Sequence, residues 1–234
     1  MNGKKTLLLL RLEGALQSWG DHSKWDTRDT GAFPSKSGIL GLLACALGWE
    51  RGDDRIAALS ASMTVAVRAD RPGELMMDFH TVQGNPRLTT ADGKPRAANQ
   101  STIVSKRWYL QDASFLAAVD VGEPWTEMVA QALSSPKWPL FLGRKNCVPS
   151  RPVLEEISTD YSDVMDAVLH HPALHREGTS VPPCGLQYEC EGFRTGAASY
   201  TRADDRRSGG RDFALRRVYS GVVPKEVGDD SDKN

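Results

Sequence analysis

The stretch TLLLLRLEGALQSWG, residues 6–20, decides the fold class of this 234-residue chain. Its first seven residues form an apolar run with the length of a buried strand, and the glycine-punctuated residues that follow predict a turn. The next apolar segment, ILGLLACAL at residues 39–47, follows the capping hydroxyls of Ser35 and Ser37 and stops at Gly48, which predicts a short buried helix. A buried strand followed by a helix that is apolar nearly all round indicates a helix packed on a sheet.

The rest of the chain extends this pattern. The hydrophobic pattern predicts strands at residues 63–68, 76–82, 108–121 (bent near Asp112) and 138–142, helices at 124–133 and about 162–169, and strand-like pieces at 186–190 and 213–223. The first 145 residues thus read β-α-β-β-loop-β-α-β. This α+β order resembles a ferredoxin-like (RRM-like) core, elaborated by a long insertion between two of its central strands.

Composition excludes several classes of protein. Forty per cent of the residues are apolar, which excludes a wholly disordered chain, and 29 basic against 30 acidic residues exclude a uniformly basic, histone-like binder. No stretch approaches the roughly 20 apolar residues that a bilayer span needs, and the N-terminus lacks a secretory signal. We therefore expect a cytoplasmic protein with no membrane association. The four cysteines are irregularly spaced, which predicts reduced thiols, no metal site and no cofactor.

Positive charge is concentrated in three segments of this otherwise neutral chain. Residues 87–107 carry five bases and one acid, residues 137–151 carry four bases and no acid, and residues 194–217 carry seven arginines and three acids, so each has a net charge of +4. In the second segment, Gly143-Arg144-Lys145 directly follows a predicted strand. Backbone N–H groups with Arg and Lys at a strand exit suit a phosphate chain. In the first segment, bases mixed with polar residues suit a polyanion backbone.

Each of these features also has a plainer interpretation. A basic segment of a neutral protein is often just a solvated surface of mixed charge. Trp19, Trp25, Trp108 and Tyr109 lie beside the basic segments in the sequence and could stack on splayed RNA bases, but each alone is more often a core or rim aromatic. The charge map thus points to a polyanion without identifying it.

Five motifs, in chain order, carry a resemblance to a known family: LLLRLEGALQSWG, FPSKSGILGLLACALG, DFHTVQG, RWYLQDASFLAAV and PLFLGRKNCVPSRP. Together they resemble the CasD family of the type I-E CRISPR surveillance complex, Cascade, over about residues 5–152. The resemblance implies a ferredoxin-like core of the repeat-associated RNA-binding type at residues 1–152, with a thumb inserted at about 83–107. It leaves a small C-terminal region, partly strand, at 153–227 and a disordered tail at 228–234.

The resemblance also implies a function. Members bind and cap the 5′ handle of CRISPR RNA without catalysis, and they anchor the backbone subunits of Cascade for antiviral defence. The implied partners are this handle, the backbone subunit CasC, the large subunit CasA and target DNA in the assembled complex. The RNA-binding segments that match contain Gln17, Ser18, Trp19, Lys36, Arg107, Tyr109, Gly143, Arg144, Lys145, Asn146 and Cys147. The thumb would add Arg87, Lys94 and Arg96.

Two other functions stay open. A related family of type I-C systems cuts repeat RNA without a metal, as a metal-independent endoribonuclease. His22, His80, Tyr109 or Lys145 could supply the base, the acid and the cation that this reaction needs. His80, however, lies in an alternating run that suits a structural histidine. The other alternative is a structural adaptor whose basic loops bind acidic protein surfaces.

Overall fold

The computed structural model describes residues 5–20, 24, 26–84, 88–90, 92–97, 102–174, 187–191, 197–207 and 212–223. These residues form a mixed α/β fold whose main sheet has seven strands, in the order β10-β11-β9-β4-β7-β1-β8. In chain order these strands are β1 (Leu7–Glu13), β4 (Thr64–Arg71), β7 (Ser114–Asp120), β8 (Leu154–Ser158), β9 (Gln187–Glu191), β10 (Ala198–Arg206) and β11 (Phe213–Val222). In the described part of the chain, no helix is both long and apolar enough to cross a bilayer.

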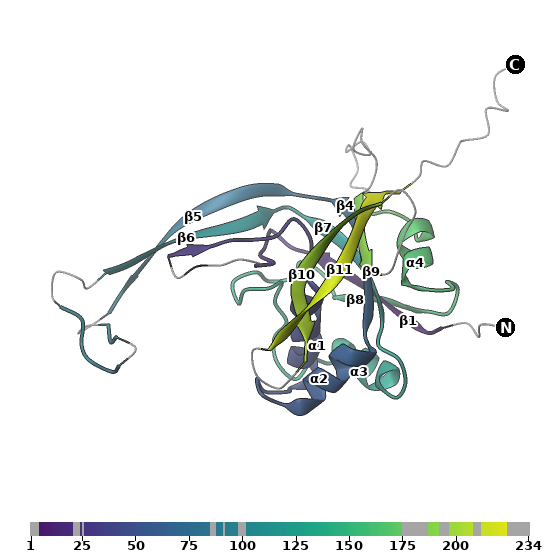
Figure 1. Ribbon diagram of the computed structural model, residues 1–234, viewed down its shortest axis with the longest axis horizontal. Coiled ribbons are helices and arrows are strands. Elements are labelled where there is room, and N and C mark those ends of the chain that lie inside the picture. The colour runs from purple at the N-terminus through teal and green to yellow at the C-terminus, as the bar shows by residue number, and fades with distance from the viewer. Residues whose placement is uncertain are drawn as a thin grey trace, which may run out of the picture.

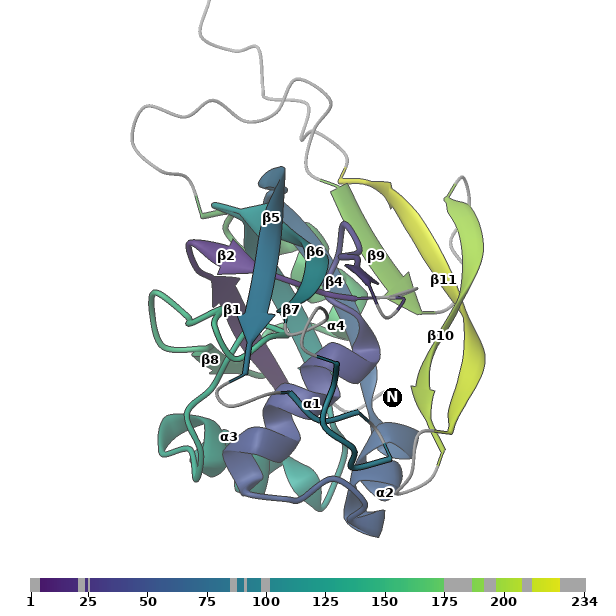
Figure 2. The same cartoon turned by 90° about the vertical axis from the view of Figure 1, so that its left-hand side faces the viewer.

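Strand β1 lies inside the main sheet and is covered on both faces. Helices α1 (Lys36–Leu47), α2 (Asp54–Ser62) and α3 (Trp125–Ser134) lie on one face, and α4 (Val164–His170) lies on the other (Figures 1 and 2). Leu8 and Leu10 pack in the core under α1 and α3, whereas Leu7 and Leu9 pack in the core under α4. A strand that is buried on both faces needs apolar residues at every position, which explains the unbroken leucine run.

A second sheet forms the arm of the molecule. Its strands β5 (Glu74–Gln83) and β6 (Thr102–Gln111) pair along their whole length, and β6 also pairs with the short strands β2 (Leu16–Gln17) and β3 (Thr27–Arg28). The β5–β6 hairpin projects far from the main sheet (Figure 1). The predicted loop at residues 83–107 is therefore wrong from residue 102 onward, because cross-strand pairing with β5 holds these polar residues in a strand.

The predicted strand at residues 108–121 is two strands in two different sheets. The chain reverses between β6 and β7, where Asp112 has a left-handed φ of 54°. The predicted strand at 138–142 is an irregular segment instead. Its end is bonded to loops, since Leu142 accepts a hydrogen bond from Ser18 N and donates one to Cys147 O. Helix α2 and strands β8 and β10 were not predicted, and the predicted tail at 228–234 lies outside the described residues.

The C-terminal strands complete the main sheet. Strand β9 pairs with β4 on one side and with β11 on the other, so residues after 153 share a sheet with the N-terminal strands. Strand β10 contacts α1 and α2 (Figure 2). The hairpin of β10 and β11 thereby becomes a wall beside α1.

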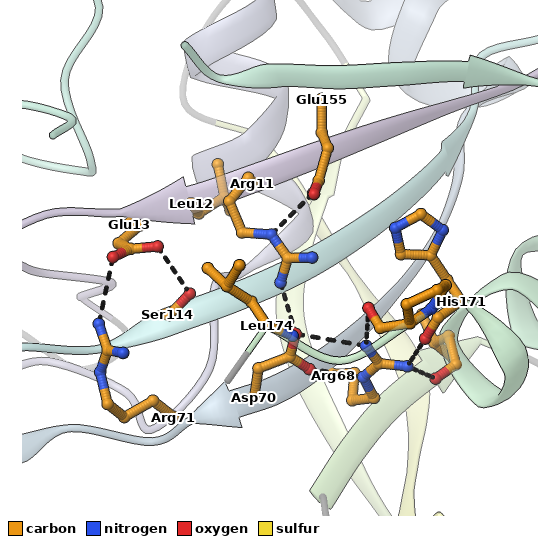
Figure 3. Close-up of polar contacts among 12 residues, drawn as sticks. Arg11, Leu12, Glu13, Arg68, Asp70, Arg71, Ser114, Glu155, His171 and Leu174 are labelled. Carbon is orange, nitrogen blue, oxygen red and sulfur yellow. Dashed lines mark hydrogen bonds and ion pairs between the residues drawn. The ribbon is translucent and has the colours of Figure 1, made fainter. Parts of the chain in front are cut away.

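A buried charge network attaches the end of α4 to the sheet (Figure 3). Asp70 on β4 lies 2.5 Å from Arg11 on β1 and 2.6 Å from Arg68, and all three side chains are at most 1% exposed. Asp70 also accepts the N–H of Leu174. Burial alone would raise the pKa of Asp70, but these donors hold that pKa below its ordinary value.

Arg68 completes the attachment. Its guanidinium donates hydrogen bonds to three backbone carbonyls at and just after the C-terminus of α4, those of Val168, His171 and Pro172. Carbonyls at a helix C-terminus lack partners within the helix, so an arginine is well suited to this place.

Candidate nucleic-acid interface

A groove of about 1090 Å³ lies over the exposed side of α1. Its lining residues come from α1, from the irregular segment 138–143, and from the paired ends of β10 and β11, where Arg206 and Phe213 are cross-strand partners. Its described lining residues contain no carboxylate and four bases: Arg28, Arg51, Lys145 and Arg206. Cations that frame an uncharged floor raise the local concentration of a polyanion.

The walls of the groove also present aromatic surface. Trp138 is 37% exposed and Phe213 is 39% exposed, and both side chains line the groove. Exposed aromatic rings beside cations are typical of sites that bind single-stranded nucleic acid, because bases stack on the rings while phosphates meet the cations.

The turn at residues 143–147 closes one end of the groove. Gly143 has a φ of +88°, and a Cβ at this position would lie 1.8 Å from the carbonyl oxygen of Ser18. Ser18 N in turn donates to Leu142 O, and Cys147 N donates to Arg144 O. The turn is thus pressed against the end of β2 at a distance that only glycine permits.

The side chain of Arg144 connects this turn to the neighbouring strands. Its guanidinium donates to the backbone carbonyls of Trp108, Arg28 and Asp29, and it lies over the Tyr109 ring at 4.8 Å. These hydrogen bonds hold β6 and the end of β3 together, which gives Arg144 a positioning role in the turn. Direct contact of Arg144 with a phosphate stays a prediction. Lys145, the next residue, is exposed and lines the groove.

Three more predicted RNA ligands support the turn with their side chains. Asn146 is exposed, but its Nδ2 donates to the hydroxyl of Tyr109, whose ring is only 2% exposed under Arg144. Cys147 is fully buried, and this burial raises the pKa of its thiol. The expectation that Tyr109 and Cys147 contact RNA directly is therefore corrected. Both side chains are buried, so they can only help to position the turn.

The side chains of the predicted RNA-binding segment Gln17, Ser18 and Trp19 are also buried and bonded within the protein. Gln17 is fully buried, and its Nε2 donates to Leu12 O and Ala113 O, while its Oε1 accepts from Trp19 Nε1. Ser18 Oγ donates to Trp108 O. Although Ser18 and Trp19 line the groove, both are at most 3% exposed. The expectation that these three side chains contact RNA directly is therefore corrected. Their polar atoms form hydrogen bonds within the protein and hold β1, β2 and β6 in register.

Lys36 lies at the first turn of α1, but it does not face the groove. Its Nζ pairs with Asp205 at 3.0 Å and Glu191 at 3.4 Å, and its backbone N–H donates to Asp204. With 5% exposure, Lys36 ties α1 to β9 and β10. The resemblance implied an RNA ligand here, and the sequence did not reveal the ion pairs because the acidic partners lie more than 150 residues away in the chain.

The arm carries the remaining predicted residues. Arg107 is half-buried and donates to Ser105 Oγ within β6, Lys94 pairs weakly with Asp92 at 3.6 Å, and the backbone of Arg96 donates to Leu88. Arg87, Trp25 and His22 lie outside the described residues. An apolar face of the arm escaped the sequence analysis, although its alternation was visible: Leu75, Met77, Phe79 and Val104 are 43–62% exposed.

The chain shares this architecture and its sequence pattern with a known family. The family model described as "CRISPR-associated protein (Cas_Cas5)" matches residues 7–219. This chain belongs to the Cas5 family. The match confirms the resemblance that the five motifs carried, and it extends the family likeness well beyond residue 152.

Two further kinds of Cas5 likeness agree. The chain is 35% identical to the CRISPR system Cascade subunit CasD of Escherichia coli (strain K12) over 164 residues, which cover 64% of this chain and 70% of that protein. A chain of a solved "CRISPR RNA-guided surveillance complex" matches with a TM-score of 0.75 and 32% identity, over 93% of this chain and 90% of that one. A "Crystal structure of Cas protein" matches with a TM-score of 0.70 and 33% identity, over 94% and 96%.

Three cations of the groove in this Cas5 chain were missed or undervalued from sequence. Arg51 gave no signal, because it lies in none of the three basic segments. Arg206 belongs to the third basic segment, in which Arg202 pairs with Glu189 and Arg216 pairs with Asp204. Arg28 is brought to the groove by the parallel pairing of β3 with β6, which no local pattern predicts.

Proposed function

We propose that this Cas5-family chain is a non-catalytic subunit of a type I-E CRISPR surveillance complex that holds the 5′ handle of the CRISPR RNA in the groove over α1. The observation that carries the proposal is the lining of the groove, in which bases and exposed aromatics meet without a described carboxylate. The names of the relatives, a Cascade subunit and an RNA-guided surveillance complex, support the choice of RNA.

The strand order supports a finer description of the fold. The elements β1-α1-β4-β7-α3-β8 repeat a β-α-β unit twice, and their strands lie in the order β4-β7-β1-β8 with antiparallel neighbours. This arrangement supports the proposal of a ferredoxin-like core. On this view the β5–β6 arm is the thumb of the family.

Replacing Lys145 by alanine tests the handle site. Lys145 is the exposed cation of the turn, so its loss should weaken binding of the 5′-handle RNA by about 1.5–3 kcal/mol if its ammonium bonds a phosphate directly. The slope of log K against log salt should also fall by about 1. Fluorescence anisotropy with labelled handle RNA at several salt concentrations measures both.

The matched control for this test is Lys5→Ala. Lys5 is 57% exposed and pairs with Asp120, and it does not line the groove, so its removal should leave the affinity unchanged. Equal affinities of wild type, Lys145→Ala and Lys5→Ala for the handle would contradict the site. An adaptor that binds acidic protein surfaces would retain no RNA at moderate salt.

We assign the arm to contact with neighbouring subunits, CasC of the backbone and CasA, and to the target DNA of the assembled, cytoplasmic complex. Exposed apolar side chains on one face and bases near its tip support this. Deleting residues 88–99 should leave thermal unfolding of the chain unchanged, because the described residues of this range contribute no strand to the main sheet. The deletion should impair assembly with CasC. Size-exclusion chromatography of the coexpressed subunits measures assembly; loss of folding on deletion would refute the assignment.

Metal-independent cleavage of repeat RNA remains the second candidate. His80 pairs with Asp78 on the arm at 3.5 Å, and its strand position lies four residues, roughly 13 Å, from Met76, the cross-strand partner of Tyr109. This separation does not favour a shared acid–base pair. We expect repeat RNA to stay intact with the purified protein in EDTA; cleavage that His80→Ala abolishes would overturn the non-catalytic role.

A further inference from the structure

We propose that the bound RNA strand follows α1 along the helix, packs a flat group, base or ribose, directly on the helix backbone at Gly41, and places a phosphate between Arg51 and Arg206 at the far end of the groove. This inference rests on the proposed function, since it defines the path of the same RNA beyond the turn at Lys145.

No contact within the described part of the chain explains why position 41 is a glycine. A glycine inside a helix costs about 1 kcal/mol relative to alanine. A Cβ at Gly38 would lie 2.9 Å from the Trp19 ring, so close packing explains that glycine. A Cβ at Gly41 would meet no atom within 4 Å, and the residue lines the groove. The open space above Gly41 indicates a ligand that approaches the helix more closely than a side chain would allow.

The walls beside Gly41 suit a flat, uncharged group. Trp138 and Phe213, in the segment 138–143 and on β11, expose more than a third of their side chains. The twelve residues of α1 span about 18 Å, so a strand that lies on the helix extends well past the turn at 143–147. An extended acidic peptide would not need two aromatic walls, whereas the bases of single-stranded RNA stack on such surfaces.

Two arginines meet at the far end of the groove. Arg51 follows α1, Arg206 ends β10, and both line the groove. They are close enough that the charge of Arg51 contributes to lowering the pKa of Arg206, although burial is the larger cause. Arg51 is exposed and Arg206 is half-buried, and two neighbouring cations at the surface attract an anion that can contact both. A phosphate is the anion that fits an RNA strand leaving the helix, since arginine pairs bind its oxygens in a forked geometry.

The test compares variants of the full chain for binding of single-stranded RNA with the 5′-handle sequence. Gly41→Leu should raise the melting temperature by about 2–4 °C, because leucine is the better helix former. The same substitution should weaken RNA binding roughly 5- to 100-fold by filling the space of one stacked group. Gly41→Ala is the smaller step in the same direction, and it carries the test if leucine disturbs folding.

The far phosphate is tested separately with the double variant Arg51→Gln and Arg206→Gln. It should lower the salt slope of binding by about 1. Arg55→Gln is the matched control, because Arg55 lies on the neighbouring helix α2, pairs with Asp53 and does not line the groove. It should bind the handle RNA as tightly as wild type.

The outcomes separate this inference from the proposed function. If Lys145→Ala weakens binding while Gly41→Leu and the double arginine variant bind as wild type does, the path along α1 is wrong and the handle site stands. If wild type binds no handle RNA, or prefers polyglutamate, both fail. Weaker binding by the more stable Gly41→Leu protein supports the path, since loss of folding cannot explain it.

Discussion

Replacing Asp70 by alanine should lower the free energy of unfolding by about 3–5 kcal/mol, because the change leaves two buried guanidinium groups without their shared carboxylate. Arg11 and Arg68 are each 1% exposed and both contact Asp70 (Figure 3). Urea unfolding followed by circular dichroism measures the loss. Asp78→Ala is the matched control on the exposed arm and should change stability by less than about 0.5 kcal/mol. A similar small effect of Asp70→Ala would mean that the network contributes no net stability.

The same network makes a prediction about pH. The folded pKa of Asp70 lies below its ordinary value, so the folded protein releases this proton more readily than the unfolded chain does. The stability from Asp70 is therefore fully present above the ordinary carboxyl pKa of about 3.9, and it is lost as the pH falls through the lower folded value. The gap between wild type and Asp70→Ala should thus narrow under acid conditions; a gap that widens there would contradict this linkage.

Gly143→Ala should displace the turn and strongly weaken RNA binding. The left-handed conformation costs a residue with a Cβ roughly 1–2 kcal/mol. The overlap with Ser18 O at 1.8 Å forces the backbone to move, at a further cost of about 1–3 kcal/mol. Lys145 would move with the turn, so the loss of handle affinity should at least equal that of Lys145→Ala.

A second glycine distinguishes the cost of the left-handed backbone from the cost of the overlap with Ser18. Gly93, in the arm, has a φ of +80° but no atom within 4 Å of its Cβ position. Gly93→Ala therefore carries the strain without the overlap. We expect Gly143→Ala to be the more destabilising in urea unfolding and to weaken RNA binding, while Gly93→Ala leaves the turn and its affinity unchanged. Equal effects of both variants would show that the contact with Ser18 is not tight in solution.

The pattern of side chains along the chain was enough for several elements. The strand at residues 6–12, the helix at 39–47, the helix at 124–133 and the glycine turn before Lys145 depend on local rules, such as burial, capping and conformational freedom. Such rules act between neighbours in sequence, and for this reason they can be applied without a structure. The family resemblance, too, depends on short motifs in a fixed order.

The roles of individual cations could not be predicted in the same way. Arg144 and Lys145 are adjacent, yet Arg144 donates to backbone carbonyls of β6 and β3, whereas Lys145 is exposed and lines the groove. Lys36 meets Asp205, and Arg11 meets Asp70, only because distant strands join one sheet. The sequence gives the sign of each charged side chain, but it does not give the group with which that side chain pairs.

Sequence alone determined that this chain has buried strands and helices in a β-α-β-β order, a family, and three basic segments, since these properties depend on residue type and spacing. The tertiary structure decided which bases face a ligand and which bind the protein itself. It also decided that α1, the segment 138–143 and the β10–β11 hairpin form one groove. Pairing between strands far apart in the chain makes these choices, because it sets burial and distance, and neither quantity is encoded in local spacing.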